Sequence, residues 1–381
     1  MFREGPVDRP EELFDREEEF RGLRDALSRR RLVLLLGVRR VGKTSLARAA
    51  THDMARVYVD LREFEWRQYV TWDNFYATLQ AALPRSKKAL DLLSRISGVS
   101  VAGFRVEFAK GRGRPPLPEV LKALDSWAGA EPRRLVVVVD EAQELYKLKG
   151  GSFTPVLAWA YDNLDNVVFL LTGSKAGLMH RLLRLDDPES PLFGRYLHVI
   201  KLSPLPREGA LEFLARGFVE SGVAYSPQLL EAAVDHLDGI IGWLSYLGLE
   251  ATRAGRLTEE LLREVVEKAA RLAWSEFCNF VKLRGTARYL HVAHAAAEGA
   301  TWSELKRYLE IREGPINDAE LSRLLRSLVE EGWVEKGDIY RLADPLMRYA
   351  AKNRGRGEPP PPRSSSTQPP SPPLSTPRPL L

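Results

Sequence analysis

The chain has 381 residues, which is more than one ordinary hydrophobic core organises, so two or three domains are expected. Hydrophobic residues make up 44% and charged residues 28%, a globular composition, and no apolar run approaches the roughly 20 residues of a membrane-spanning helix. The net charge is +5, but residues 352–381 hold five basic residues against one acid, which argues against a basic folded face for nucleic acid.

The N-terminus and the cysteine content indicate the compartment. Residues 1–10 carry charges where an export signal needs an apolar core. The sole cysteine, Cys278, cannot form an internal disulfide. Both features predict a cytoplasmic protein.

Residues 1–202 alternate predicted strands and helices, which is typical of an α/β domain with a parallel sheet. An amphipathic helix is predicted at 16–30, ahead of a first strand at 31–36. Three more runs have the continuous hydrophobicity of strands covered on both faces: 56–61, 135–139 and 167–171. Helical spacing is found between them at 43–51, 72–83, 118–127 and 154–163.

One segment departs from this alternation of strands and helices. Residues 99–108 alternate apolar and polar side chains about Gly103, which predicts an inserted hairpin. The following residues, 110–118, are rich in Gly, Arg and Pro and predict a mobile, solvated loop rather than a polyanion site.

The remainder divides into three parts. Residues 203–284 predict a helical lid domain. Residues 285–351 predict a winged helix-turn-helix domain, with helices at 287–298, 303–310 and 318–331 and a hairpin formed by 332–334 and 339–342. Residues 352–381 predict a disordered tail, because 355–381 contains ten prolines among serines.

The most specific motif is GxxxxGK[ST], which lies between the first predicted strand and a helix, the context that it requires. Its glycines let backbone N–H groups face phosphate oxygens, and the helix presents its positive end to the same anion. Lys43 is predicted to reach the β and γ phosphates, and Thr44 to ligate Mg²⁺. The predicted ATP-binding loop is Gly37, Val38, Arg39, Arg40, Val41, Gly42, Lys43, Thr44 and Ser45.

Two acids, Asp140 and Glu141, follow the strand at 135–139, at the sheet edge where ligands bind. Asp140 is predicted to hold Mg²⁺ through its water shell, and Glu141 to orient and polarise the attacking water. Acids after a strand are common in loops. Their pairing with the upstream phosphate motif is what predicts ATP hydrolysis.

The strand at 167–171 leads into Thr172, Gly173 and Ser174, which would lie beside the two acids. Ser174 is the preferred sensor of the γ-phosphate and Thr172 the second candidate, while a helix cap at Ser174 is a comparable alternative. The segment lacks the acid of an NKxD-like guanine motif, which favours adenine.

Three arginines are weaker candidates. Arg195 follows an acidic loop at 186–191, from which a guanidinium could reach the phosphate charge of the transition state. An ion-paired surface arginine is an equal alternative. Arg39 and Arg40 lie in the variable part of the phosphate loop, and solvated charges are narrowly favoured there over phosphate ligands.

Taken together, these residues resemble the archaeal P-loop ATPases of the STAND class, relatives of AAA+ proteins, from about residue 6 to residue 350. The resemblance rests on LFDREEEF at 13–20, RRVGKTS at 39–45, YVDLR at 58–62, DEAQ at 140–143, GS at 173–174, PLFGR at 191–195, GWL at 242–244 and YRLADP at 340–345.

The resemblance implies an extra strand between the phosphate-loop strand and the acidic strand, a helical lid and a C-terminal winged helix. It also implies that Phe14 and Arg16 lie near the adenine and that Glu141 is the hydrolytic base. Gly242 and Trp243 depart from the pattern, because many relatives have proline after this glycine, so the contact of the lid with phosphate stays unassigned.

Three functions are compatible with these features. An ATPase switch with a mobile lid and winged helix is favoured; a DNA-binding protein of the replication-initiator kind and an ATP-dependent scaffold with negligible hydrolysis are the alternatives. Glu141 disfavours the scaffold. Residues 285–351 hold nine basic and eleven acidic residues, including Asp318 and Glu320 at the start of the recognition helix, so a protein partner or self-association is favoured over DNA.

Overall fold

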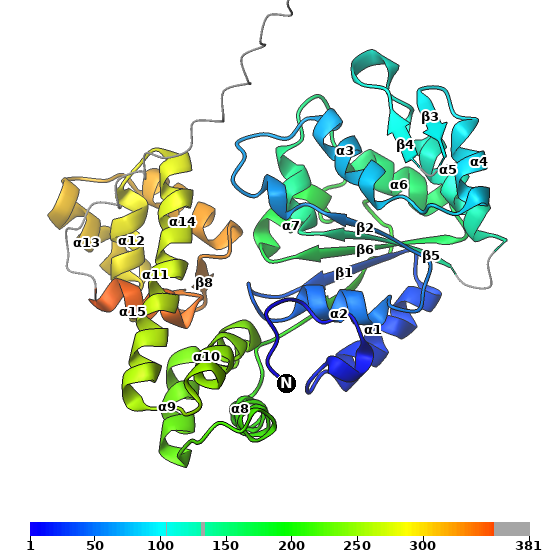
Figure 1. The fold of residues 1–381 in the computed structure, drawn as a ribbon. Coiled ribbons are helices and arrows are strands. Elements are labelled where there is room, and N and C mark those ends of the chain that lie inside the picture. The colour runs from blue at the N-terminus through cyan, green and yellow to red at the C-terminus, as the bar shows by residue number, and fades with distance from the viewer. Residues whose placement is uncertain (104, 131–133, 354–381) are drawn as a thin grey trace, which may run out of the picture.

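The computed structural model describes residues 1–103, 105–130 and 134–353, and it shows an α/β body beside a helical body (Figure 1). The sheet of the α/β body is formed by β1 (Leu32–Leu36), β2 (Arg56–Asp60), β5 (Leu135–Asp140), β6 (Val167–Gly173) and β7 (His198–Lys201). Its helices are α1 (Glu17–Arg29), α2 (Lys43–Ala50), α3 (Trp72–Ala82), α4 (Lys87–Ser94), α5 (Leu117–Ala128), α6 (Thr154–Asn163) and α7 (Ala176–Leu183).

The five strands are parallel and lie in the order β2-β5-β6-β1-β7. β6 pairs with β1 on one side and with β5 on the other. The predicted extra strand between the phosphate-loop strand and the acidic strand is therefore confirmed.

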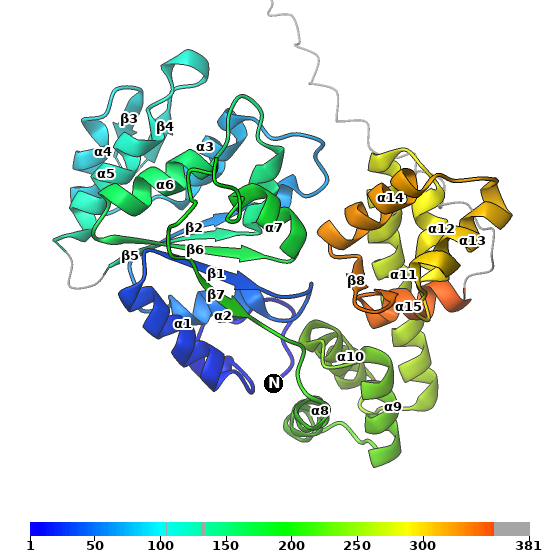
Figure 2. The ribbon, with the colours of Figure 1, turned by 180° about the vertical axis from the view of Figure 1, so that it is seen from behind.

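Helices cover both faces of this sheet, as the view from behind shows (Figure 2). Val33 and Leu35 of β1 pack with α1 and α2 on one face, whereas Leu32 and Leu34 belong to the cluster that includes α3, α5 and α6 on the other. Because both sides of each central strand are buried, these strands appear in the sequence as unbroken apolar runs.

One edge strand of the sheet, β7, was missed by the sequence patterns, whereas an inserted hairpin was predicted. β7 alternates half-buried and exposed residues at the sheet edge, so it lacks the apolar run of a central strand. The predicted hairpin is confirmed as β3 (Val99–Ala102) and β4 (Arg105–Phe108), which pair antiparallel. A short 3-10 turn at Gly111–Gly113 occupies part of the segment that was predicted to be a loop.

The helical body begins with α8 (Arg207–Ser221), α9 (Pro227–Leu237), α10 (Ile241–Ala254) and α11 (Glu259–Arg284). The winged helix follows as α12 (Arg288–Ala295), α13 (Trp302–Glu313), α14 (Asp318–Glu330), β8 (Val334–Lys336) and β9 (Tyr340–Leu342). Ala300 adds a bridge to Tyr340, with backbone hydrogen bonds of 2.8 and 2.9 Å.

The lid helices and the winged helix share one hydrophobic core, which extends from Leu205 to Ala351. α11 and the unpredicted α15 (Pro345–Asn353) pack closely at its centre. The predicted domain boundary at 284/285 therefore coincides with the end of α11, and one hydrophobic core continues across it.

α15 also includes the first two residues of the tail predicted at 352–381. The rest of that tail, 354–381, lies outside the described residues. Within the described part of the chain, no helix has the length and apolar content needed to cross a bilayer.

Candidate functional site

The loop between β1 and α2 has the backbone of a phosphate cradle. Gly42 has φ of 105°, which side chains rarely adopt, and a Cβ at Gly37 would lie 2.5 Å from the Leu202 carbonyl oxygen. α2 begins at Lys43, so its first backbone N–H groups face the loop. Glycine is thus required at both ends of the loop, as the motif predicts.

Lys43 is directed into this cradle. Lys43 is only 5% exposed, and its ammonium donates hydrogen bonds to the carbonyl oxygens of Gly37, at 2.8 Å, and Val38, at 2.9 Å. Burial lowers the pKa of Lys43, while the carboxylates of Glu141 and Asp140 act to raise it. A buried cation that only carbonyl oxygens and nearby acids satisfy is well suited to a phosphate anion.

Three hydroxyl groups donate hydrogen bonds to Asp140. Its carboxylate accepts hydrogen bonds from Thr44 Oγ1 at 3.0 Å, from Tyr58 at 2.8 Å and from Thr172 Oγ1. The Thr44 hydroxyl and the Asp140 carboxylate are hard oxygen donors of the kind that Mg²⁺ prefers. These residues therefore fit the predicted metal site.

Of these three hydroxyl groups, only that of Tyr58 has a position that the sequence did not reveal, since Thr172 was predicted to lie beside the two acids. Tyr58 comes from the neighbouring strand β2, whose Asp60 lies in register with Asp140. Burial and the Asp140 charge raise the pKa of Tyr58, so the phenol stays protonated and donates. Thr172 is fully buried and also accepts from the Glu141 backbone N–H at 3.0 Å, so it positions both acids.

Glu141 has the strained backbone that often marks a functional residue, with φ of 54° and ψ of 46°. Its carboxylate accepts from the Ser174 hydroxyl at 2.6 Å and from the side-chain amide of Gln143. Burial alone would raise the pKa of Glu141, but Lys43 and these two donors bring it below its ordinary value. Glu141 is therefore an ionised carboxylate whose Oε2 atom accepts both hydrogen bonds.

Ser174 thus lies beside the acids, as expected. The competing interpretation of Ser174 as a helix cap is not seen, because Lys175 precedes α7 and no side chain caps that helix. Gln143 is a further residue of the candidate site that sequence reasoning missed, although it stands in the DEAQ motif. It is fully buried, and its Oε1 has no hydrogen-bond partner among the described residues.

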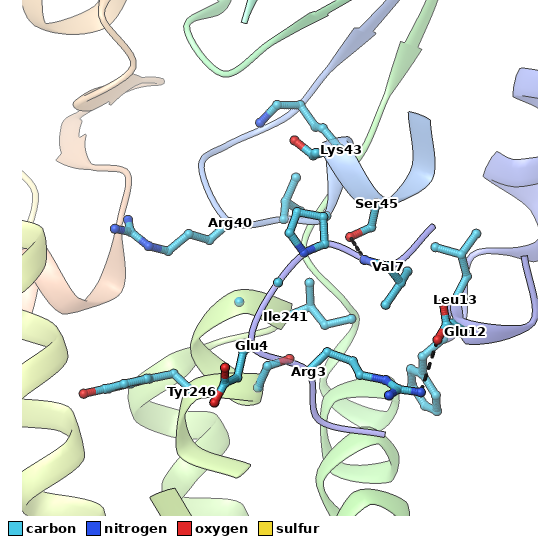
Figure 3. A pocket seen from close by; sticks show the side chains of 18 of the residues that line it. Arg3, Glu4, Val7, Glu12, Leu13, Arg40, Lys43, Ser45, Ile241 and Tyr246 are labelled. Carbon is cyan, nitrogen blue, oxygen red and sulfur yellow. Dashed lines mark hydrogen bonds and ion pairs between the residues drawn. The ribbon is translucent and has the colours of Figure 1, made fainter. Parts of the chain in front are cut away.

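Beside the cradle is a cavity of about 530 Å³ (Figure 3). Lys43, Thr44, Ser45 and Glu141 line it together with Phe14, Arg16 and the lid residues Phe213, Ile241 and Tyr246. The rings of Phe14 and Phe213 are 5.2 Å apart, and Arg16 donates to the Ser203 carbonyl oxygen at 2.7 Å. The structure therefore brings the predicted base-binding residues and the phosphate cradle to one cavity between the two bodies.

Arg39 and Arg40 turn toward the lid, and the interpretation of them as solvated charges is wrong. Both form ion pairs with Glu276 of α11. The Arg40 guanidinium also lies 4.2 Å from the ring centroid of Trp243, and Figure 3 shows this side chain extending away from Lys43. Both arginines still line the cavity beside the cradle, and the charge of Arg39 helps to lower the pKa of Glu141.

The lid also contacts the backbone of the cradle directly. The Gly242 N–H donates to the Arg40 carbonyl oxygen at 3.0 Å. A Cβ at Gly242 would lie 2.7 Å from the Arg40 Cβ, so the approach requires glycine.

The end of α14 docks on the segment that follows Ser174. A Cβ at Gly177 would lie 2.4 Å from Glu330 Cα, and one at Gly332 would lie 3.2 Å from the Ser174 carbonyl oxygen. Arg181 of α7 forms an ion pair with Glu330 at 2.8 Å. The winged helix therefore directly touches residues 174–177, which we call the sensor segment after the role predicted for Ser174.

Lys175 occupies the centre of this contact and is only 4% exposed. Its ammonium lies 3.1 Å from Glu144, 3.4 Å from Glu331 and 3.7 Å from Glu65. These acids come from three separate segments, including the end of α14. One buried cation thus joins the sensor segment, the acidic strand's loop and the winged helix.

Arg195 does not line the cavity. Its guanidinium pairs with Asp162 of α6, with Nε 3.1 Å from Oδ1. The Asp162 hydrogen bond raises the pKa of Arg195. Within one copy of the chain, Arg195 and the candidate site are not brought together.

Comparison with known families agrees with both bodies. A family model described as "ATPase domain predominantly from Archaea" matches residues 13–247. A second model, "MCM protein C-terminal winged helix-turn-helix domain", matches residues 285–343. A search of curated proteins finds no match.

Solved structures extend this comparison. The Walker-type ATPase PABY2304 of Pyrococcus abyssi is 32% identical, covers 92% of this chain and 99% of its own, and superposes with a TM-score of 0.79. The Aeropyrum pernix ORC2 protein in its ADPNP–ADP complexes is 17% identical, covers 92% of this chain and 96% of its own, and has a TM-score of 0.58, which shows a shared fold. The chain therefore belongs to the family of ATPase domains found predominantly in Archaea, here joined to an MCM-like winged helix.

Proposed function

We propose that this protein is a cytoplasmic, Mg²⁺-dependent ATP hydrolase of the STAND class that acts as a conformational switch. The observation that carries the proposal is the docking of the α14 end on the sensor segment. A residue that reads the γ-phosphate is thereby next to the winged helix. Hydrolysis at the site would then directly change the contacts that the winged helix makes with this segment.

The roles of the site residues follow from their positions. Lys43 neutralises phosphate charge in the cradle, and Thr44 with Asp140 would hold Mg²⁺, which supplies positive charge at the phosphates. Glu141 accepts the proton of the attacking water. In the structure its Oε2 atom accepts from Ser174, so a turn of that hydroxyl would free this oxygen for the attacking water.

That exchange connects the chemistry with the winged helix. If the Ser174 hydroxyl turns to a γ-phosphate, it leaves Glu141 free to accept from water. A shift of Ser174 would move Lys175, which is the next residue in the chain. It would also move Gly332, which lies close to the Ser174 carbonyl oxygen. In this proposal the docked arrangement is the less active one, because Ser174 holds the Oε2 atom of Glu141, and release of α14 favours turnover.

Neutralising one acid at the contact tests this proposal. In Glu331→Gln, Lys175 and Arg284 lose a charged partner while the side-chain size is kept, so ATP turnover should rise several-fold. Glu335→Gln on β8 is the matched control, because Glu335 is exposed and lies outside this contact. Phosphate release that is the same in wild type and in Glu331→Gln would contradict the coupling.

DNA binding of the initiator kind is the second candidate, favoured by the match to the MCM winged helix. The recognition helix argues against it. Asp318 pairs with Lys306 at 2.7 Å and Glu320 pairs with Arg288, so acids stand where base edges would approach. Arg323 and Arg326 are its exposed cations.

A scaffold that binds ATP without turnover is the third candidate. The ionised Glu141 disfavours it, because a carboxylate in that position is able to accept a proton. We propose that the partner of the switch is a protein, a second copy of this chain or another, to which Arg195 could contribute in trans. Turnover that depends on protein concentration would support self-association.

A further inference from the structure

Residues 1–7 form one wall of the cavity and link the two bodies. Figure 3 shows this segment, which we call the strap, passing between Ser45 of α2 and Ile241 of the lid. Arg3, Glu4 and Val7 line the cavity. Phe2 does not line it; it packs against the core of the helical body instead.

Phe2 occupies a slot that two glycines create. A Cβ at Gly217 of α8 would lie 2.3 Å from the Phe2 ring, and a Cβ at Gly248 of α10 would lie 2.2 Å from it. Phe213 and Phe218 complete the slot, with ring centroids 5.6 and 5.4 Å from that of Phe2. Any larger residue at either glycine would occupy the space of the ring.

The other end of the strap is bound to the α/β body. The Val7 N–H donates to the Ser45 hydroxyl at 3.3 Å, directly beside the phosphate cradle. Asp8 then pairs with His52 at 3.0 Å and with Arg56 at 3.1 Å. The strap is therefore anchored at both ends, by an aromatic ring on the lid side and by polar contacts on the cradle side.

We propose that Phe2 is a positioning residue for the bound nucleotide, which holds the strap against the cavity and slows nucleotide release. The slot has no other evident purpose, since glycines in the middle of α8 and α10 weaken both helices. The proposal rests on the cavity being the nucleotide site. It does not depend on the switch or on hydrolysis.

Release of fluorescent ADP from the full chain, measured by stopped flow, tests the proposal. Phe2→Ala removes the ring, and Gly248→Ala fills the slot; each should raise the release rate about tenfold, the effect of losing one buried aromatic contact. Gly22→Ala is the matched control, because Gly22 lies in a helix with nothing within 4 Å of an added Cβ. Its release rate should equal that of wild type.

The double variant Phe2→Ala with Gly248→Ala separates this role from general destabilisation. Once the ring is gone, the added methyl group has nothing to displace, so the double variant should release ADP at the rate of Phe2→Ala alone. Additive effects, or an unchanged release rate in both single variants, would overturn the proposal. Unchanged release with normal ADP affinity would leave the nucleotide site itself in place.

Discussion

The phosphate cradle and the contact between α7 and α14 are both polar and each contains a buried lysine, yet they are built in different ways. The cradle uses residues that are close in sequence, such as Gly37, Gly42 and Lys43, on one sheet edge. The α7–α14 contact joins Lys175 and Arg181 to Glu331 and Glu330, about 150 positions further along the chain. The chemistry is thus encoded in contiguous motifs, and its proposed control in single residues far apart.

Lys43→Ala should have the largest effect on the cradle. Removing the buried ammonium leaves the phosphates without their closest cation, a loss of about 2–5 kcal/mol for one partner of a buried charge pair. Titration with fluorescent ATP should show affinity at least about thirtyfold weaker. Lys149→Ala, at an exposed lysine away from the cavity, is the control, and equal affinities would remove Lys43 from the site.

Glu141→Gln should leave ATP binding intact and slow hydrolysis by about a hundredfold or more, the usual contribution of a positioned base. The amide can accept a hydrogen bond but cannot take a proton. Single-turnover phosphate release is the measurement. A wild-type rate would assign the base to another residue.

Glu276→Ala should have a smaller effect at the second contact between the bodies, where one acid pairs with both Arg39 and Arg40. Freed from the lid, these arginines could turn toward the phosphates, and ATP turnover should change by several-fold. Glu267→Ala on the same helix, whose carboxylate lies 3.8 Å from Arg271, is the control. Equal turnover in both variants would show that this contact is structural only.

Duplex DNA should bind the full chain only weakly near 0.15 M salt, with a shallow salt dependence, because few cations on α14 are free to meet phosphates. The full chain is needed, since the winged helix shares its core with the lid. Fluorescence anisotropy across a salt series is the measurement. Submicromolar, sequence-selective binding would favour the initiator-like function.

Arg195→Ala should have the smallest effect. In dilute protein, turnover should match wild type, because Arg195 pairs with Asp162 outside the cavity of its own chain. Mixing Arg195→Ala with Lys43→Ala protein tests action in trans. Hydrolysis in the mixture at high protein concentration that exceeds the sum of the two variants measured alone would show that one copy supplies its arginine to the other.

Sequence patterns predicted the central strands, the hairpin and the winged helix because each carries a local signal, an apolar run or helical spacing. They missed α4 and α7, which have only eight residues each, and the edge strand β7. α15 had a usable signal. Asp344 caps it by accepting from the Leu346 N–H at 2.8 Å, and Pro345 follows that cap directly.

In the candidate site, too, the residues that belong to a local sequence motif were predicted and the others were not. Lys43, Thr44, Asp140 and Glu141 lie together as expected, since a loop and a strand end meet at one sheet edge. The direction in which the Arg39 and Arg40 side chains point could not be predicted. Their partner, Glu276, lies on α11, far away in the sequence. The contacts of Phe2 and Lys175 could not be predicted either, because their partners are distant in the sequence and are brought close only by packing.

The central claim is that nucleotide state controls the α7–α14 contact. Hydrogen exchange of the full-length Glu141→Gln protein, which should hold ATP without hydrolysing it, tests this most directly in residues 174–183 and 326–334. We predict faster exchange in both segments with Mg²⁺ and ATP than with ADP, because α14 leaves the sensor segment. Identical exchange with the two nucleotides, at saturating occupancy, would contradict the switch.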